Sequence, residues 1–212
     1  DMDTMIEIRG LSKTYGKHQV LKDIGVDFEK GKIHGIIGRN GSGKTVLMKC
    51  ICGFTKPDCG SILVGGQKVS GSQMPSGIGI IIESPGFIDN MSGFKNLQML
   101  ASIRKQIGKD KIRETMRRLE LDPDEKKPVR TYSLGMRQRL GIAQAIMEGP
   151  ELLILDEPMN SLDKKGVEMV RNTLKQMKEE GTTILLASHY AEDIDALCDT
   201  VSEMDQGVLT KE

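Results

Sequence analysis

The stretch that decides the fold reads Gly38-Arg-Asn-Gly-Ser-Gly-Lys44-Thr45. It follows an apolar run at residues 33–37 and precedes a helical pattern at residues 46–51. Strand, glycine-rich loop and helix in this order predict a phosphate-binding loop, because the glycines let successive amides point inward and the helix N-terminus adds partial positive charge. The residues expected to bind the phosphates are Gly38, Asn40, Gly41, Ser42, Gly43, Lys44 and Thr45. Lys44 supplies a charge, and Thr45 a hydroxyl for Mg²⁺.

A second motif lies at the end of another apolar run, where residues 152–155 lead into Asp156-Glu157-Pro158. Ligands of open α/β sheets bind at the carboxyl ends of the strands. We therefore expect Asp156 to be an outer ligand of Mg²⁺. Glu157, one residue further, is expected to orient the attacking water or to accept its proton, a role that contributes about 10²- to 10⁴-fold in rate.

The rest of the chain predicts an α/β fold with a mainly parallel sheet, an antiparallel β subdomain and an inserted α-helical subdomain. Short apolar runs are typical of strands covered on both faces, whereas alternating segments are typical of an antiparallel layer. The apolar runs are residues 33–37, 78–82, 152–155 and 183–187, and the alternating segments are residues 5–9, 26–29 and 61–69.

The chain length and the helical spacing suggest one domain over residues 1–212. Residues 84–149 lack strand character and repeat apolar side chains at helical spacing, so they are expected to form the helical subdomain. The core with its β subdomain is expected to comprise residues 1–83 and 150–212.

Composition narrows the classes of partner. Thirty basic and thirty acidic residues give no net charge, which argues against nucleic-acid binding by counterion release. The apolar runs are far shorter than the roughly 20 residues that a bilayer requires, and the first residues lack the pattern of a signal peptide. We expect a cytoplasmic chain without a membrane-spanning helix.

The segment Tyr132-Ser-Leu-Gly-Met-Arg-Gln-Arg139 narrows the superfamily. It precedes the Asp156 motif and resembles the signature of the ATP-binding cassette family, Leu-Ser-Gly-Gly-Gln. Three of the five positions differ, but Ser133 and Gly135 are kept, and a hydroxyl with a helix N-terminus suffices to bind a γ-phosphate. The resemblance implies that these groups bind ATP on a second, head-to-tail copy, which permits a homodimer.

Four further segments correspond to the family in order, and one of them, Asn160-Ser-Leu-Asp163, resembles the segment that crosses the dimer interface. Tyr15 resembles the aromatic residue that stacks on adenine, and His189 resembles the switch histidine that contacts the γ-phosphate. Glu83 stands where the family usually has the Gln that touches Mg²⁺ or the attacking water. We therefore expect Glu83 to join the catalytic residues and the metal ligands, and to tune metal affinity and pH dependence.

The resemblance implies an Mg-dependent ATPase subunit of a transporter, bound peripherally at the cytoplasmic side of the membrane. Its partners would be membrane-spanning permease subunits on separate chains. Glu83 and the Tyr132–Arg139 run resemble exporters of peptide antibiotics and drugs. The alternative is a soluble cassette ATPase in cofactor assembly. A phosphate-loop kinase would carry an acceptor-binding lid and no Ser133-x-Gly135 signature.

Overall fold

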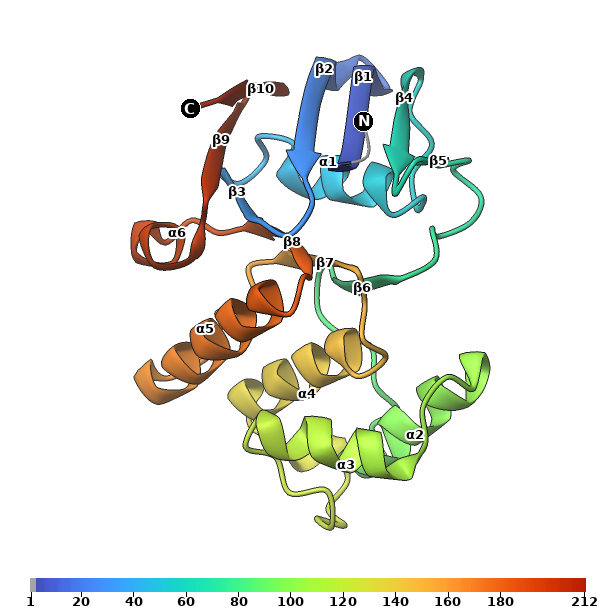
Figure 1. The fold of residues 1–212 in the computed structure, drawn as a ribbon, viewed down its shortest axis with the longest axis vertical. Helices are drawn as coiled ribbons and strands as arrows, with labels where there is room; N and C mark the ends of the chain where they lie inside the picture. The colour runs from blue at the N-terminus through green and yellow to red at the C-terminus, as the bar shows by residue number, and fades with distance from the viewer. Residues whose placement is uncertain (1–2) are drawn as a thin grey trace.

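The structure, a computed structural model, describes residues 3–212 (Figure 1). The strands are β1 (Thr4–Tyr15), β2 (His18–Glu29), β3 (Ile33–Ile37), β4 (Cys59–Val64), β5 (Gln67–Lys68), β6 (Ile78–Ile81), β7 (Leu152–Asp156), β8 (Thr183–Ala187), β9 (Thr200–Asp205) and β10 (Val208–Lys211). The helices are α1 (Lys44–Ile51), α2 (Gly93–Arg104), α3 (Lys109–Arg118), the short 3₁₀ helix η1 (Val129–Thr131), α4 (Leu134–Ile146), α5 (Lys164–Glu179) and α6 (Ala191–Leu197).

The larger sheet has the strand order β10-β9-β3-β8-β7-β6. Its neighbours pair in parallel from β9 to β6, and only β10 is antiparallel to β9. The four apolar runs of the sequence form β3, β8, β7 and β6, as predicted. Because these strands run in parallel, the loops after β3, β6, β7 and β8 emerge at the same edge of the sheet.

The smaller sheet is antiparallel, with the order β2-β1-β4-β5. The alternating segment at residues 61–69 forms a hairpin of β4 and β5, which pair around Gly65 and Gly66. Both glycines have positive φ, which this tight turn requires and which glycine adopts without a steric penalty.

Helix α1 and the two sheets form one hydrophobic core, and the remaining helices form another on the opposite face of the larger sheet. Alternation along β7 explains how one strand serves both cores. Leu152 and Ile154 pack with α1, whereas Leu153 and Leu155 pack with α4 and α5. A strand buried on both faces reads as an uninterrupted apolar run, and for this reason the sequence predicted it.

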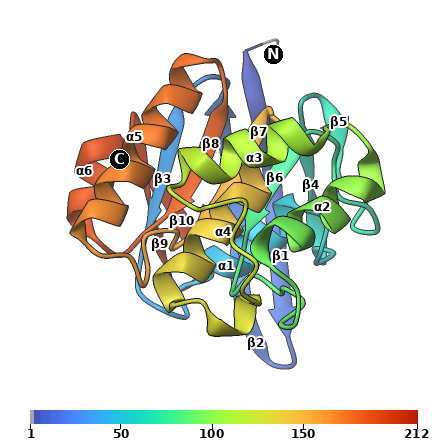
Figure 2. The ribbon, with the colours of Figure 1, turned by 90° about the horizontal axis from the view of Figure 1, so that it is seen from below.

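Helices α2, α3 and α4 lie between β6 and β7 in the chain and gather at one end of the molecule, opposite the antiparallel sheet (Figure 1). Seen from that end, α3 and α4 lie in front of the larger sheet (Figure 2). Among residues 3–212, no helix combines the length and the apolar character needed to cross a bilayer.

Two strands of the larger sheet, β9 and β10, were not predicted. β9 reads Thr-Val-Ser-Glu-Met-Asp and buries only Ser202 and Met204, so its apolar signal is weak. Pairing with β3 decides its conformation, and a contact between segments so far apart in the sequence leaves no local trace. Strand β2 also begins at His18, well before the alternating segment at residues 26–29.

Candidate active site

The phosphate loop joins the end of β3 to the start of α1, and its glycines are required by geometry. Gly38 has φ of 153°, and a Cβ atom there would lie 2.3 Å from the carbonyl oxygen of Met204. Gly43 has φ of 112°, and a Cβ atom there would lie 2.8 Å from the carbonyl oxygen of Val20. Any larger residue would therefore push the loop away from its neighbours.

Polar groups line the inside of this loop. The Lys44 side chain is 6% exposed, and its ammonium group donates a hydrogen bond to the carbonyl oxygen of Gly38. The hydroxyl oxygen of Ser42 is buried and has no hydrogen-bond partner within the described part of the chain. A buried hydroxyl without a partner is costly, so the loop offers hydrogen-bonding capacity that a phosphate could use.

A cavity of about 590 Å³ opens in front of the loop. Its walls are formed by His18, Val20, Arg39, Asn40, Gly41, Gly43, Lys44, Thr45, Val46, Asp156 and Glu157. The sequence pointed to neither His18 nor Val20, which come from the start of β2. Tyr15 is half exposed at the end of β1, with the ammonium of Lys13 5.1 Å from its ring centroid, and it does not line the cavity.

Thr45 and Asp156, 111 positions apart in the chain, meet at the floor of the cavity. The Thr45 hydroxyl donates to Asp156 Oδ2 at 2.8 Å. Burial raises the pKa of Asp156 above its usual value, while the hydrogen bond from Thr45 acts in the opposite direction. A hydroxyl and a carboxylate placed side by side provide the hard oxygen ligands that Mg²⁺ prefers.

Within residues 3–212, no three His, Cys, Asp or Glu side chains converge on one point where they could hold a metal ion. The pair of Thr45 and Asp156 fits Mg²⁺ nonetheless, because this ion is typically held by one or two carboxylates together with substrate phosphates and water. The remaining ligands would therefore come from a bound nucleotide.

Glu157 follows β7 with φ of 50°, a left-handed conformation that is uncommon for residues other than glycine. His189 Nδ1 lies 2.8 Å from Glu157 Oε1, so the loops after β7 and β8 meet here. The approach does not have the alignment of a hydrogen bond, and Glu157 Oε1 is buried without an aligned donor in the described residues. This oxygen therefore keeps an acceptor position that no donor of the described residues uses.

A buried ion pair supports the loop that carries His189. The carboxylate of Asp193, at the start of α6, is 3% exposed. It accepts hydrogen bonds from Arg171 Nε at 3.0 Å and Nη2 at 2.5 Å, and its other oxygen lies 3.4 Å from the hydroxyl of Ser188. The pair anchors α6 on α5 immediately after His189. Sequence reasoning missed it, because neither residue belongs to a motif.

Glu83 also has a left-handed backbone, with φ of 65°, two residues after the end of β6. Its carboxylate does not join Thr45 and Asp156 but forms an ion pair with Lys49, with Oε1 2.7 Å from Nζ. Lys49 lies one helical turn after Thr45 on α1, so the pair borders the metal position without entering it. Glu83 is near enough to Asp156 to contribute to raising the pKa of that carboxyl.

Ser133 and Gly135 lie apart from the cavity, at the N-terminus of α4. The Ser133 hydroxyl accepts a hydrogen bond from the amide of Met136 at 3.1 Å and caps the helix. A Cβ atom on Gly135 would lie 3.0 Å from the carbonyl oxygen of Ser161, so little space remains there. Ser133 is exposed, and this helix end faces no phosphate loop of its own chain.

Comparison with known proteins agrees with this arrangement. Residues 21–160 match the family model described as ABC transporter. The bacitracin transport ATP-binding protein BcrA of Enterococcus faecalis is 41% identical over 214 residues, covering 100% of this chain and 70% of that protein. The lantibiotic transport ATP-binding protein SrtF of Streptococcus pyogenes is 36% identical over 210 residues, covering 98% of this chain and 91% of that protein.

Among solved structures, the ATP-binding cassette MJ0796, in a dimeric post-hydrolysis state bound to ADP and Pi, superposes with a TM-score of 0.88. The match covers 98% of both chains at 22% sequence identity. At this identity the similarity concerns the fold, and it confirms the α/β phosphate-loop architecture predicted from the sequence.

Proposed function

The chain belongs to the ABC transporter family as an ATP-binding subunit, and from this premise we propose that it hydrolyses Mg·ATP between two copies of itself. Hydrolysis would drive export of a peptide antibiotic or a drug through membrane-spanning subunits on separate chains. The relatives named for transport of bacitracin and of lantibiotics support this substrate class. They do not favour the alternative of a soluble ATPase in cofactor assembly.

The observation that carries the proposal is the division of the site. Lys44, Thr45, Asp156, Glu157 and His189 come together within one chain. Ser133 and Gly135 are left at an exposed helix end that faces no phosphate loop of its own chain. A helix N-terminus with a hydroxyl group attracts phosphate oxygens, so a second copy arranged head to tail would complete each site.

Within each site we assign the binding of ATP to the phosphate loop. Its inward amides and Lys44 would bind the β- and γ-phosphates, and Tyr15 would stack on adenine once the nucleotide is present. Mg²⁺, held by Thr45 and Asp156, would neutralise the charge that develops on the phosphate oxygens. Glu83 would modulate this metal position from its ion pair with Lys49.

For hydrolysis we assign the proton transfer to Glu157. Its carboxylate would accept a hydrogen bond from the attacking water and take its proton. The oxygen of that water forms a bond to the γ-phosphorus, the bond from this phosphorus to the bridging oxygen breaks, and ADP leaves with the bonding electrons. His189 would hold Glu157 in position and contact the γ-phosphate.

Mixing two impaired variants tests the shared site. A Lys44→Ala homodimer has two damaged phosphate loops, and a Ser133→Ala homodimer has two damaged helix ends. A mixed dimer pairs the intact loop of one chain with the intact helix end of the other, so it contains one complete site. We expect the mixture to regain ATPase activity above the sum of the separate variants. A mixture that only adds the two separate activities would contradict the proposal.

The transport role needs its own test, because it concerns partners outside this chain. We expect the protein, purified from membranes after mild cross-linking, to carry multi-span membrane proteins with it. At the membrane it would be peripheral and face the cytoplasm, attached through those partners. Recovery only with soluble proteins of cofactor assembly would instead support the alternative function.

A further inference from the structure

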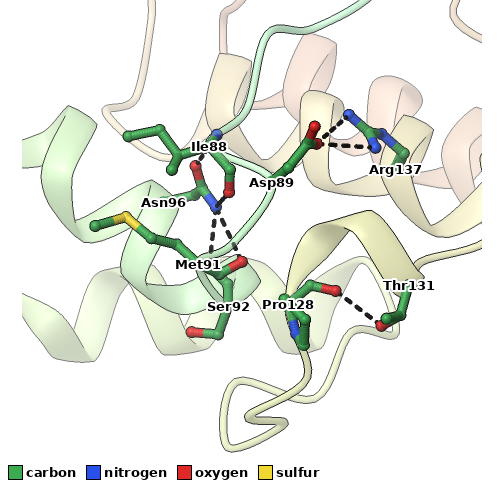
Figure 3. Close-up of polar contacts among 8 residues, drawn as sticks. All are labelled: Ile88, Asp89, Met91, Ser92, Asn96, Pro128, Thr131 and Arg137. Carbon is green, nitrogen blue, oxygen red and sulfur yellow. Dashed lines mark hydrogen bonds and ion pairs between the residues drawn. The ribbon is translucent and has the colours of Figure 1, made fainter.

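Residues 88–93, which we call the strap, lead from the loop after β6 into α2 (Figure 3). Asn96, on the first turn of α2, is 1% exposed, and its amide group is directed into the strap. Its Oδ1 accepts from the amide of Ile88 at 2.8 Å, and its Nδ2 donates to the carbonyl oxygens of Ile88 at 3.1 Å and Ser92 at 3.0 Å. A buried side-chain amide satisfied by strap backbone holds the strap in one conformation.

The strap is bonded in turn to residues 128–132, which immediately precede α4. The amide of Val129 donates to the carbonyl oxygen of Met91 at 2.9 Å, and the amide of Arg130 donates to the carbonyl oxygen of Asp89 at 3.1 Å. Backbone hydrogen bonds of this kind link two segments that are about forty residues apart in the sequence. The two segments are therefore expected to move together.

Side chains extend the link to the first turn of α4. The hydroxyl of Tyr132 accepts a hydrogen bond from the buried amide of Gly93 at 3.2 Å. Both Nη atoms of Arg137 lie 3.3 Å from Asp89 Oδ1 (Figure 3). The amide of Arg137 also donates to the carbonyl oxygen of Ser133 at 3.0 Å. The ion pair with Asp89 therefore attaches the strap to the first turn of α4, which begins after Ser133.

We propose that Asn96, Asp89 and Arg137 are positioning residues that set, through the strap, where Ser133 lies for the nucleotide of a second copy. This inference rests on the proposed function, in which Ser133 completes the site of another chain. The strap begins only five residues after Glu83, and its hydrogen bonds to Val129 and Arg130 connect it to the segment that precedes Ser133 and α4. Loosening the strap would therefore shift the N-terminus of α4 and weaken the pairing of copies.

Hydrogen exchange in the monomer without nucleotide tests the strap itself. We expect Asn96→Ala to speed the exchange of the Val129 and Arg130 amides at least about tenfold. We expect Asp89→Ala to speed it about threefold, since an exposed ion pair contributes little. Asp124→Ala is the matched control, because Asp124 is 69% exposed against 62% for Asp89 and forms an ion pair elsewhere in the helical region. It should leave both amides unchanged.

Pairing of copies tests the consequence for Ser133. In a Glu157→Gln background, Asp89→Ala should raise the ATP concentration needed for dimerisation about threefold while leaving the ATP affinity of the monomer unchanged. The charge swap of Asp89→Arg with Arg137→Asp should restore pairing. This readout separates positioning from folding, because a merely structural defect would also change monomer affinity.

The proposal is overturned if Asp89→Ala and Asp124→Ala behave alike in exchange and in pairing, or if the swap restores nothing. The Asp89 and Arg137 variants carry the test even if Asn96→Ala fails to fold. Failure of the Glu157→Gln background to pair at all contradicts the proposed function, whereas the exchange rates still decide whether the strap holds α4.

Discussion

Two helix N-termini in this chain differ in what surrounds them. Helix α1 begins after Gly43, faces a cavity of about 590 Å³ and has Asp156 and Glu157 of its own chain opposite. Helix α4 begins after Ser133 and is capped by that side chain, and its first residue, Leu134, is 72% exposed. The first end forms part of a site within the chain, whereas the second lies outside that cavity. This difference is the basis of the proposal that catalysis needs two copies.

The largest expected effect is on the rate of ATP hydrolysis, from a change in the cavity in front of α1. Glu157→Gln removes the group proposed to accept a proton from water, and we expect the ATPase rate to fall about 10²- to 10⁴-fold. ATP binding should be retained, because the phosphate loop is intact. Single-turnover hydrolysis of radiolabelled ATP measures this rate. Glu151→Gln, an exposed glutamate before the other end of β7, is the matched control and should hydrolyse normally.

A smaller effect is expected for the phosphate loop itself. Lys44→Ala removes a buried ammonium group from the phosphates, and a hydrogen bond to a charged group contributes about 1.5–3 kcal/mol. We expect ATP to bind about 100-fold more weakly, as measured by titration with a fluorescent ATP analogue. Lys68→Ala, on exposed β5, should bind normally. Equal affinities for the two variants would remove Lys44 from the site.

The second region is tested by Ser133→Ala. This change removes a hydroxyl proposed to bind the γ-phosphate on another copy, so the ATP concentration needed for dimerisation should rise about tenfold. ATP affinity of the monomer should stay the same, because Ser133 lies outside the cavity. Ser133→Thr keeps both the hydroxyl and the helix cap and should pair normally. Weaker monomer binding in Ser133→Ala would show that the two regions are not separate.

The smallest expected effect is on metal affinity, from a change in the ion pair of Lys49 and Glu83 beside Thr45 and Asp156. Lys49→Met frees the carboxylate of Glu83, whose negative charge then attracts Mg²⁺ more strongly, and we expect affinity for Mn²⁺ with ATP to rise about threefold. Electron paramagnetic resonance of free Mn²⁺ measures this affinity. Adding Glu83→Gln to Lys49→Met should cancel the gain. An unchanged affinity in Lys49→Met would exclude Glu83 from any influence on the metal.

The same contrast explains what could be predicted from the sequence. The phosphate loop is eight consecutive residues between a strand and a helix, and Asp156 and Glu157 end an apolar run, so local pattern sufficed. Ser133 was predictable as a helix cap for the same reason. The residues of these motifs are either neighbours in the sequence or follow parallel strands that end at the same edge of the sheet.

The supporting residues could not be predicted, because tertiary packing brings their partners together. Lys49 and Glu83 are 34 positions apart, and Arg171 and Asp193 are 22 apart. A lysine on a helix or an arginine near an acidic segment has no distinctive pattern, so these ion pairs appear only once the sheet and helices are assembled. Asn96 is similarly indistinct in sequence, although its buried amide holds the strap.

The most direct test of the shared site is the mass of the Glu157→Gln protein in solution, measured by light scattering with saturating ATP and Mg²⁺. Two chains per particle with ATP, and one with ADP, is the result that the divided site requires. A single chain that retains bound ATP at every protein concentration would contradict it, because the exposed end of α4 would then have no nucleotide to bind.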